Sequence, residues 1–328
     1  YIGINHQGSA SGGSILIETP LLEVGGVIAA NGGDTSEIGN SYSGGGGGGR
    51  IGIHTKSLSW LGNESQSRSS AMLVADGGRK ICTSYCYPGF PGTIFINASM
   101  LEDLIVSDGV TLNGLVPVAE DIAWKSVNIN VGGTLTTGSG GSSDSSGVLL
   151  KVEGDVLIHG EMKFRGVTIY CKQMNVTGKL SGDNMILDGG IGTPEGTSGG
   201  GSAHGGAGGN GQLSPSSSYL GSTTIYGSIS RPISFGSSIK QNKGGGAVRI
   251  VASVGVVVET SGSISANGGG RYIGINHQGG ASGGSILIET PLLAVGGVIA
   301  ANGGDTSAIG NSYSGGGGGG RIGIHTSV

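Results

Sequence analysis

The residues best placed to do chemistry are acidic side chains that occur in close pairs. Cleavage of a polysaccharide needs convergent carboxylates, or a carboxylate beside Arg or Lys. The acidic pairs are Asp34 with Glu37, Glu102 with Asp103, Glu120 with Asp121, and Asp183 with Asp188. Adjacent residues of a strand point to opposite faces, which weakens the second and third pairs. Glu37 is replaced by Ala308 in a second copy of its segment, so we expect these acids to be solvated surface residues.

The histidines do not have the spacing of a metal site. They are His6 and His277, His54 and His325, His159, and His204, and none belongs to an HExxH motif or a Cys/His cluster. We expect His54 to lie on the outer face of its strand. A calcium-binding β-roll needs tandem nonapeptides, and the stretch at 32–35 matches only their start. We therefore expect no cofactor, no metal and no catalysis.

Cysteines and sequons suggest modification of the chain. Cys82 and Cys86 flank a turn-rich insertion and are a candidate disulfide in an oxidising compartment, whereas Cys171 lies in an expected strand as a small buried hydrophobe. Three sequons make Asn63, Asn97 and Asn175 candidate acceptors of N-linked glycans. Asn63 falls in an irregular insertion, where a glycan would be best tolerated.

The composition favours a repeat architecture over a compact globule. Gly accounts for 74 of 328 residues, while aromatic residues are 5% and charged residues 12%. A hydrophobic fraction of 36% with a net charge of −4 argues against disorder, and the lack of a Gly-X-Y period excludes collagen. No basic patch points to nucleic acid, and no apolar run is long enough for a membrane span.

A long internal repeat organises the chain. Residues 1–55 recur as residues 272–326, an offset of 271, with differences only at Ser9/Gly280, Glu23/Ala294 and Glu37/Ala308. Such similarity indicates a tandem duplication or a window of a longer periodic polymer, and we favour the polymer. Because the sequence starts at Tyr1 without Met, we expect a processed or excised piece.

A shorter unit of roughly 20–30 residues lies within this repeat. It consists of Gly, a strand with alternating Ile, Val or Leu, a short connection, a second strand and Ala-Asn/Asp-Gly-Gly. Ile15 and Ile17 share one face of their strand because the pleat has a period of two. One coil cannot bury this row alone, but a coil stacked about 4.8 Å away can. We predict an all-β parallel β-helix, or β-solenoid, with Gly-rich loops and almost no helix.

We expect one continuous solenoid over 1–328, with a less regular middle over 80–240 and a Gly-rich insertion over 189–211. Three Gly-rich tracts leave two interpretations open. These tracts are 44–49 with its copy 315–320, 139–147, and 189–211. They form either flexible loops or extended polyglycine-type helices that pack closely beside the solenoid, since only Gly permits such close backbone approach.

The pattern Gly-Gly-x-Ile-x-Ile, then Ala-Asn-Gly-Gly, then six Gly before Arg-Ile resembles the glycine-rich β-helix repeats of large secreted surface and adhesin-type proteins. The resemblance covers residues 1–78 and 244–326 best. It implies an extracellular location, whether secreted, on the cell surface or in a matrix, and no catalysis.

We therefore predict a non-catalytic structural repeat unit of an extracellular fibre or long adhesin stalk. Its partner would be itself, by coil-on-coil or head-to-tail continuation, because neither end looks capped. One alternative is a carbohydrate-active β-helix, similar to a lyase or a tailspike, which requires Asp, Arg or Lys on adjacent coils beside a cleft. Another is a solenoid that binds glycans or ice, which requires an aligned row of Thr, Ser or Asn.

Overall fold

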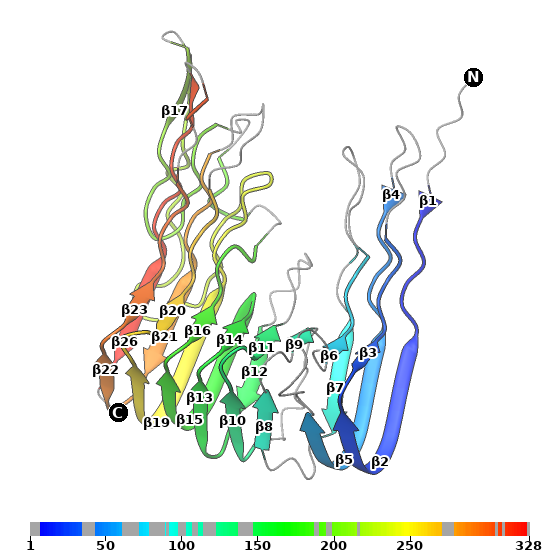
Figure 1. Cartoon of the computed structure of the whole chain (residues 1–328). Helices are drawn as coiled ribbons and strands as arrows, with labels where there is room; N and C mark the ends of the chain where they lie inside the picture. Colours follow the sequence, from blue (N-terminus) through cyan, green and yellow to red (C-terminus); the bar gives the residue numbers. More distant parts are fainter. Residues whose placement is uncertain are drawn as a thin grey trace, which may run out of the picture. The chain divides into compact units, whose positions relative to one another are not determined.

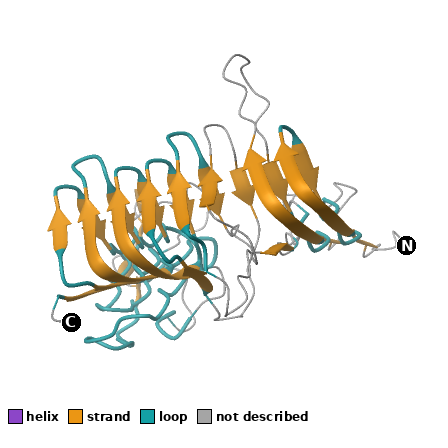
Figure 2. Ribbon diagram, turned by 90° about the horizontal axis from the view of Figure 1, so that it is seen from below, coloured by secondary structure: helices purple, strands orange, loops and turns teal. Residues whose placement is uncertain are grey.

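The computed structural model describes residues 7–34, 43–60, 72–78, 89, 92–97, 103–106, 111–113, 123–136, 147–186, 190–194, 199–214, 217–270, 279–305, 308–309 and 312–326. Over these ranges the chain forms strands and no helix (Figure 2), which confirms the all-β prediction. None of these residues forms a helix long and apolar enough to cross a membrane.

The chain divides into two compact units, each treated separately below. Unit 1 comprises Tyr1–Ser142, Lys151–Gly154 and His159–Glu161, and unit 2 comprises Ser143–Leu150, Asp155–Ile158 and Met162–Val328. Whether the chain forms one continuous solenoid over 1–328 stays a prediction.

Unit 1 is built from parallel sheets in which neighbouring strands are distant in sequence (Figure 1). One sheet has the order β2-β5-β7, another has β11-β9-β6-β3, and the pairs β1-β4 and β8-β10 are also parallel. The strands are β1 (Gln7–Gly8), β2 (Ser14–Val24), β3 (Val27–Ala29), β4 (Ser43–Gly44), β5 (Arg50–Trp60), β6 (Met72–Val74), β7 (Thr93–Asn97), β8 (Asp103–Val106), β9 (Thr111–Asn113), β10 (Ser126–Ile129) and β11 (Thr134–Thr136).

Unit 2 follows the same plan. Its main parallel sheet has the order β26-β21-β19-β15-β13, and a second has β23-β20-β16-β14. A small antiparallel sheet, β18-β17-β25-β24, is an addition that the repeat pattern did not predict. The strands are β12 (Val148–Lys151), β13 (Asp155–Ile158), β14 (Glu161–Lys163), β15 (Gly166–Val176), β16 (Lys179–Ser181), β17 (Gly211–Ser214), β18 (Ser217–Tyr219), β19 (Ala247–Val258), β20 (Ser263–Ser265), β21 (Ser285–Glu289), β22 (Leu293–Val295), β23 (Val298–Ala300), β24 (Ala308–Ile309), β25 (Ser312–Tyr313) and β26 (Arg321–His325).

The core consists of rows of branched side chains that run across neighbouring strands. Ile169 lies opposite Ile250, which lies opposite Ile288, and all three are fully buried. Within each strand, the residues directly before and after these isoleucines point to the other face, as the period of two predicts. Each row is buried only because the next strand supplies the next member of that row.

The two copies of the 55-residue segment fold in the same register. In unit 1, Ile15 pairs with Ile51 across β2 and β5. In unit 2, Ile286 pairs with Ile322 across β21 and β26. Both partners are shifted by 271 residues, so the sequence repeat is also a structural repeat.

The Gly-rich tracts that the structure describes are packed against one another. The N–H groups of Gly315 and Gly318 donate to the carbonyls of Gly199 and Ser202. Those of Gly317 and Gly320 donate to Gly304 and Ala301, just as Gly46 and Gly49 donate to Gly33 and Ala30 in unit 1. Each neighbour is thus contacted every third residue, the period of an extended three-residue helix. The packed interpretation is confirmed for 44–49, 315–320 and 199–209, whereas 139–146 lies outside the described residues.

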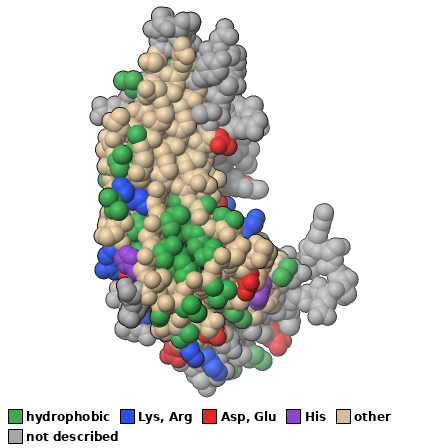
Figure 3. All heavy atoms as spheres, turned by 90° about the vertical axis from the view of Figure 1, so that its left-hand side faces the viewer, with side chains coloured by type: hydrophobic (Ala, Val, Ile, Leu, Met, Phe, Trp, Pro, Cys, Tyr) green, Lys and Arg blue, Asp and Glu red, His purple; other side chains and the backbone are tan. Residues whose placement is uncertain are grey.

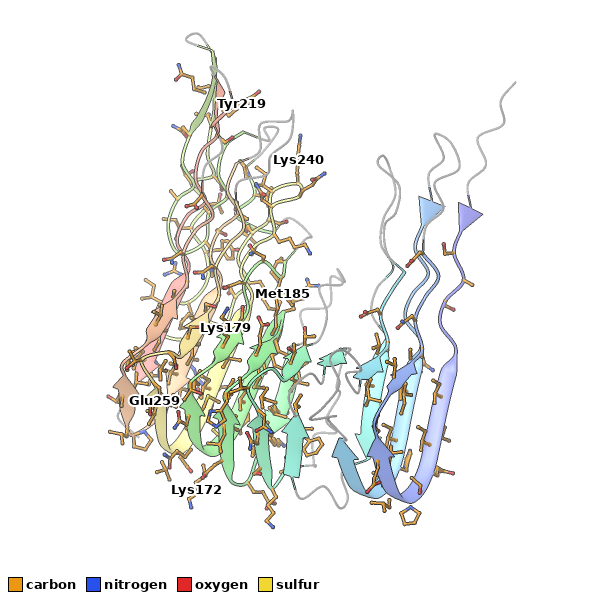
Figure 4. The ribbon with its side chains drawn as sticks, viewed as in Figure 1. Lys172, Lys179, Met185, Tyr219, Lys240 and Glu259 are labelled. Atoms are coloured by element: carbon orange, nitrogen blue, oxygen red, sulfur yellow. The ribbon has the colours of Figure 1, made fainter. Side chains whose placement is uncertain are left out.

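Close backbone approach explains why these tracts are glycine. A Cβ on Gly317 would overlap the carbonyl oxygen of Ala281, and one on Gly46 would overlap that of Ala10. The segment 315–320 contacts four neighbours, 199–202, 205–209, 280–283 and 301–304. These five segments are here called the glycine bundle. Figure 4 shows Tyr219 beyond the glycine bundle, at the end of the unit away from the strands that carry Lys172 and precede Glu259.

Gly317→Ala is expected to destabilise unit 2 because its Cβ would push the Ala281 backbone away. Overpacking of this kind costs about 1–3 kcal/mol, and each kcal/mol lowers the melting temperature by roughly 2–4 °C in a unit of this size. Gly319→Ala is the matched control, because the nearest atom to its Cβ would be 4.0 Å away. Thermal unfolding followed by circular dichroism measures both variants, and equal melting temperatures would contradict the packing described above.

Candidate functional site

Each predicted acidic pair has at least one member outside the described residues, so the pairs themselves stay predictions. The Asp183 carboxylate accepts hydrogen bonds from the Ser265 hydroxyl, at 2.9 Å, and from the Asn267 N–H. Asp183 thereby holds the Asn-Gly-Gly corner after β20. Asp34 accepts the Ser9 hydroxyl through its backbone carbonyl, and Asp103 begins β8. The other acids lie outside the described residues: Glu37, Glu102, Glu120, Asp121 and Asp188. Among the described residues, no group of three or more His, Cys, Asp or Glu side chains could hold a metal ion.

The predicted modification sites are only partly described. Asn63, Cys82 and Cys86 lie outside the described residues, and Asn97 is the last residue of β7. Asn175 lies in β15 between Leu157 and Val257, and its Oδ1 is buried with no hydrogen-bond partner. Their modification stays a prediction.

Cys171 is a buried free thiol, as expected. Burial raises the pKa of its thiol to about 12, and the nearby Asp155 charge adds to this shift. The group is therefore un-ionised at neutral pH and acts as a small hydrophobe.

His204 is a buried polar residue that sequence reasoning missed. Its ring is fully buried in the glycine bundle, 4.6 Å from the Tyr226 ring. Nδ1 lies 2.7 Å from the Gly283 carbonyl, which can only accept, so Nδ1 carries the proton. Nε2 is buried with no hydrogen-bond partner. The only signal in the sequence was a lone imidazole flanked by small residues.

The environment keeps His204 neutral. Burial lowers the pKa of its imidazole, and the nearby Arg321 charge lowers it further, although the hydrogen bond to Gly283 opposes both effects. Because the folded chain favours the neutral imidazole, protonation of His204 at low pH should destabilise unit 2.

A segment of residues 226–235, here called the strap, crosses the outer face of unit 2. Arg321 Nε donates to the Tyr226 carbonyl, and the Ser285 hydroxyl donates to the Ser234 carbonyl. The His325 ring lies 2.7 Å from the Ser230 carbonyl. The Tyr226 hydroxyl donates to the Phe235 carbonyl at 2.7 Å, a bond within the strap. The other three contacts fasten the strap to β21 and β26.

A single carboxylate links the strap to two strands. Glu289 on β21 accepts from Arg249 on β19 at 2.7 Å and from Arg231 of the strap at 3.2 Å. Arg249 also lies over the Tyr170 ring, at 5.8 Å from its centre. Two guanidinium groups therefore neutralise Glu289, which suits a fastening better than a proton-transfer group.

The strap explains a difference between the two copies. Leu287 on β21 is fully buried, whereas Leu16, the same residue of the first copy, is 64% exposed. Pro232 of the strap lies over Gly323, beside Leu287. The described part of unit 1 shows no corresponding cover over Leu16.

The last strand of unit 2 presents an apolar edge. Ile322 and Ile324 on β26 are 43% and 47% exposed, whereas the same residues of the first copy, Ile51 and Ile53, are 1% and 0% exposed. In unit 1, β7 pairs with β5 and covers them. Figure 3 shows hydrophobic side chains gathered on this end of unit 2, over β22, β23 and β26.

No protein-family model, curated protein or solved structure matches the chain in the comparisons made with it.

His204 is expected to make stability depend on pH. Its pKa is lowered in the folded chain, so the unfolded chain binds more protons as pH falls below about 6.5, and stability is lost from there toward the lowered pKa. The melting temperature of His204→Gln should fall less between pH 8 and pH 5 than that of the unchanged chain. Both chains should be compared first at pH 8, where the imidazole is neutral in both states. An equal fall in both chains would show that another group is responsible.

The same substitution in the two copies should have unequal effects. Leu287→Ala removes a buried side chain beneath the strap and should cost about 2–5 kcal/mol. Leu16→Ala removes a mostly exposed one and should change stability by about 0.5 kcal/mol or less. Denaturant unfolding of the two single variants measures the difference, and equal losses would refute the covering role of the strap.

Proposed function

We propose that this chain is a structural, non-catalytic repeat unit of an extracellular fibre or long adhesin stalk, folded as a parallel β-helix. The observation that carries the proposal is the shared register of the two copies. The pairing of Ile15 with Ile51 recurs 271 residues later as the pairing of Ile286 with Ile322. A unit that repeats both sequence and strand pairing is suited to periodic extension.

The hydrogen-bond geometry supports a mechanical role. Parallel strands bond to neighbours on both sides, as β19 does to β15 and β21. The glycine segments bond to neighbours in the same manner. Releasing one segment therefore requires breaking backbone bonds to two or more others, which favours resistance to local unfolding.

A carbohydrate-cleaving role would need two convergent acids or an available acid beside a base. One acid that the described strands place beside basic residues is Glu289, and Arg249 and Arg231 already pair with it. This arrangement favours the structural role. The extracellular part of the proposal rests on the resemblance to secreted surface repeats and on the three sequons.

Imaging of the native material tests the proposed function. Filaments should show an axial period of about 30–40 Å, which is the length of 271 residues when paired strands lie 36–43 residues apart in sequence, as in β2-β5, β19-β21 and β5-β7, and stack about 4.8 Å apart. Isolated, monodisperse particles without this period would contradict the proposal. Incubation of the purified chain with polysaccharides gives a second readout, because release of new reducing ends would favour the carbohydrate-active alternative.

A further inference from the structure

The exposed edge of β26 has a counterpart in the first copy, and there a neighbouring strand covers it. In unit 1 the equivalent strand β5 pairs on its far side with β7, whose sequence is Thr-Ile-Phe-Ile-Asn. Ile94 of β7 lies opposite Ile51, and both are 1% exposed. The β5 sequence Arg-Ile-Gly-Ile-His is thus paired with a strand of five residues. From its first to its last position, that strand has a small polar residue, an Ile, a large apolar residue, an Ile and a polar residue.

The beginning of β2 matches that pattern position by position. Its residues 14–18 read Ser-Ile-Leu-Ile-Glu. Among the described residues β2 pairs with β5 alone, whereas β21, its counterpart in the second copy, pairs with both β19 and β26. The open edge of β2 therefore lies where the second copy has a neighbour. An unpaired strand edge is a template for another strand.

We propose that two copies of this chain join head to tail, with β26 of one copy adding in parallel to the open edge of β2 of the next. The inference rests on the proposed function and identifies its partner surface. Ile322 and Ile324 would lie opposite Ile15 and Ile17 of the second copy, extending the apolar row of unit 2 across the junction. Gly323 would lie opposite Leu16.

The glycine at the centre of β26 makes room for the leucine opposite it. Inside unit 1, Gly52 lies between Leu16 and Phe95 on the two neighbouring strands. Gly323, its counterpart in β26, already lies opposite Leu287 on one side. A large apolar residue on its other side reproduces the arrangement around Gly52.

The polar ends of the two strands also match in residue type. His325 would lie opposite Glu18 of the second copy, a pairing that the chain makes internally between Glu18 and His54 and between Glu289 and His325. This junction uses different surfaces on the two copies, so it leaves both outer ends open and generates a filament rather than a closed dimer.

The test is a complementation experiment with the full chain. Ile324→Lys blocks the β26 edge, and Ile17→Lys blocks the β2 edge, so each variant alone should associate at least about tenfold more weakly than the unchanged chain. An equimolar mixture should form discrete dimers, because one intact edge remains on each partner. Val254→Lys is the matched control, since Val254 is 45% exposed, close to the 47% of Ile324, on a strand that has neighbours on both sides.

Sedimentation velocity across a range of concentrations measures association, and circular dichroism checks that each variant is folded. A second pair of variants, Ser14→Cys and Arg321→Cys, should crosslink between copies under oxidation, because the proposed register places these residues directly opposite. Ser14→Cys with His325→Cys is out of register and should not crosslink.

The outcomes separate this inference from the proposed function. If Val254→Lys weakens association as much as Ile324→Lys, or if the mixture forms no dimers, the junction is wrong. If purified chains stay monomeric while native filaments show the 271-residue period, the repeats continue within one longer polypeptide, and the head-to-tail inference fails although the proposed function stands. Filaments joined head to tail would repeat once per 328-residue chain, and isolated particles without any axial period would overturn both.

Discussion

Backbone hydrogen bonding between segments that are distant in sequence constrains the rest of this structure. A β-strand or an extended glycine helix satisfies few of its own N–H and C=O groups, so each segment depends on its neighbours. In the sheets this dependence places β15 beside β19, across a gap of more than seventy residues. In the glycine bundle it surrounds 315–320 with four other segments. Everything else in the fold serves to keep neighbouring segments at bonding distance.

The chain meets that constraint in two chemically opposite ways. In the strands, branched side chains such as Ile250 and Ile288 fill the space on the inner face. In the bundle, the absence of a side chain lets backbones touch directly, as Gly317 does with Ala281. The first arrangement gains stability from apolar burial, and the second from dense packing and hydrogen bonds. This division explains how a chain with 74 glycines and few aromatic residues folds at all.

The local part of this plan could be predicted from the sequence, and the non-local part could not. Alternation of Ile15 and Ile17 indicated the strands, and the six-glycine tracts indicated close packing, because both signals lie within a few residues. The strap and the burial of His204 depend on which distant segments meet. Pro232 covers Gly323 from about ninety residues away, and no periodicity in either segment encodes that contact. The same holds for the antiparallel pairing of β17 with β25.

The near-identical copies separate what a residue contributes from what its surroundings contribute. Leu16 and Leu287 share the same local sequence but differ from 64% exposed to fully buried. Ile53 is 0% exposed and Ile324 is 47% exposed, because β7 pairs with β5 on the side where the described residues place no strand beside β26. Burial in this fold is therefore a property of position along the stack rather than of residue type. Among the described residues, β2 and β26 each pair on one side only, so the apolar rows of both units end at a strand that can accept a further neighbour.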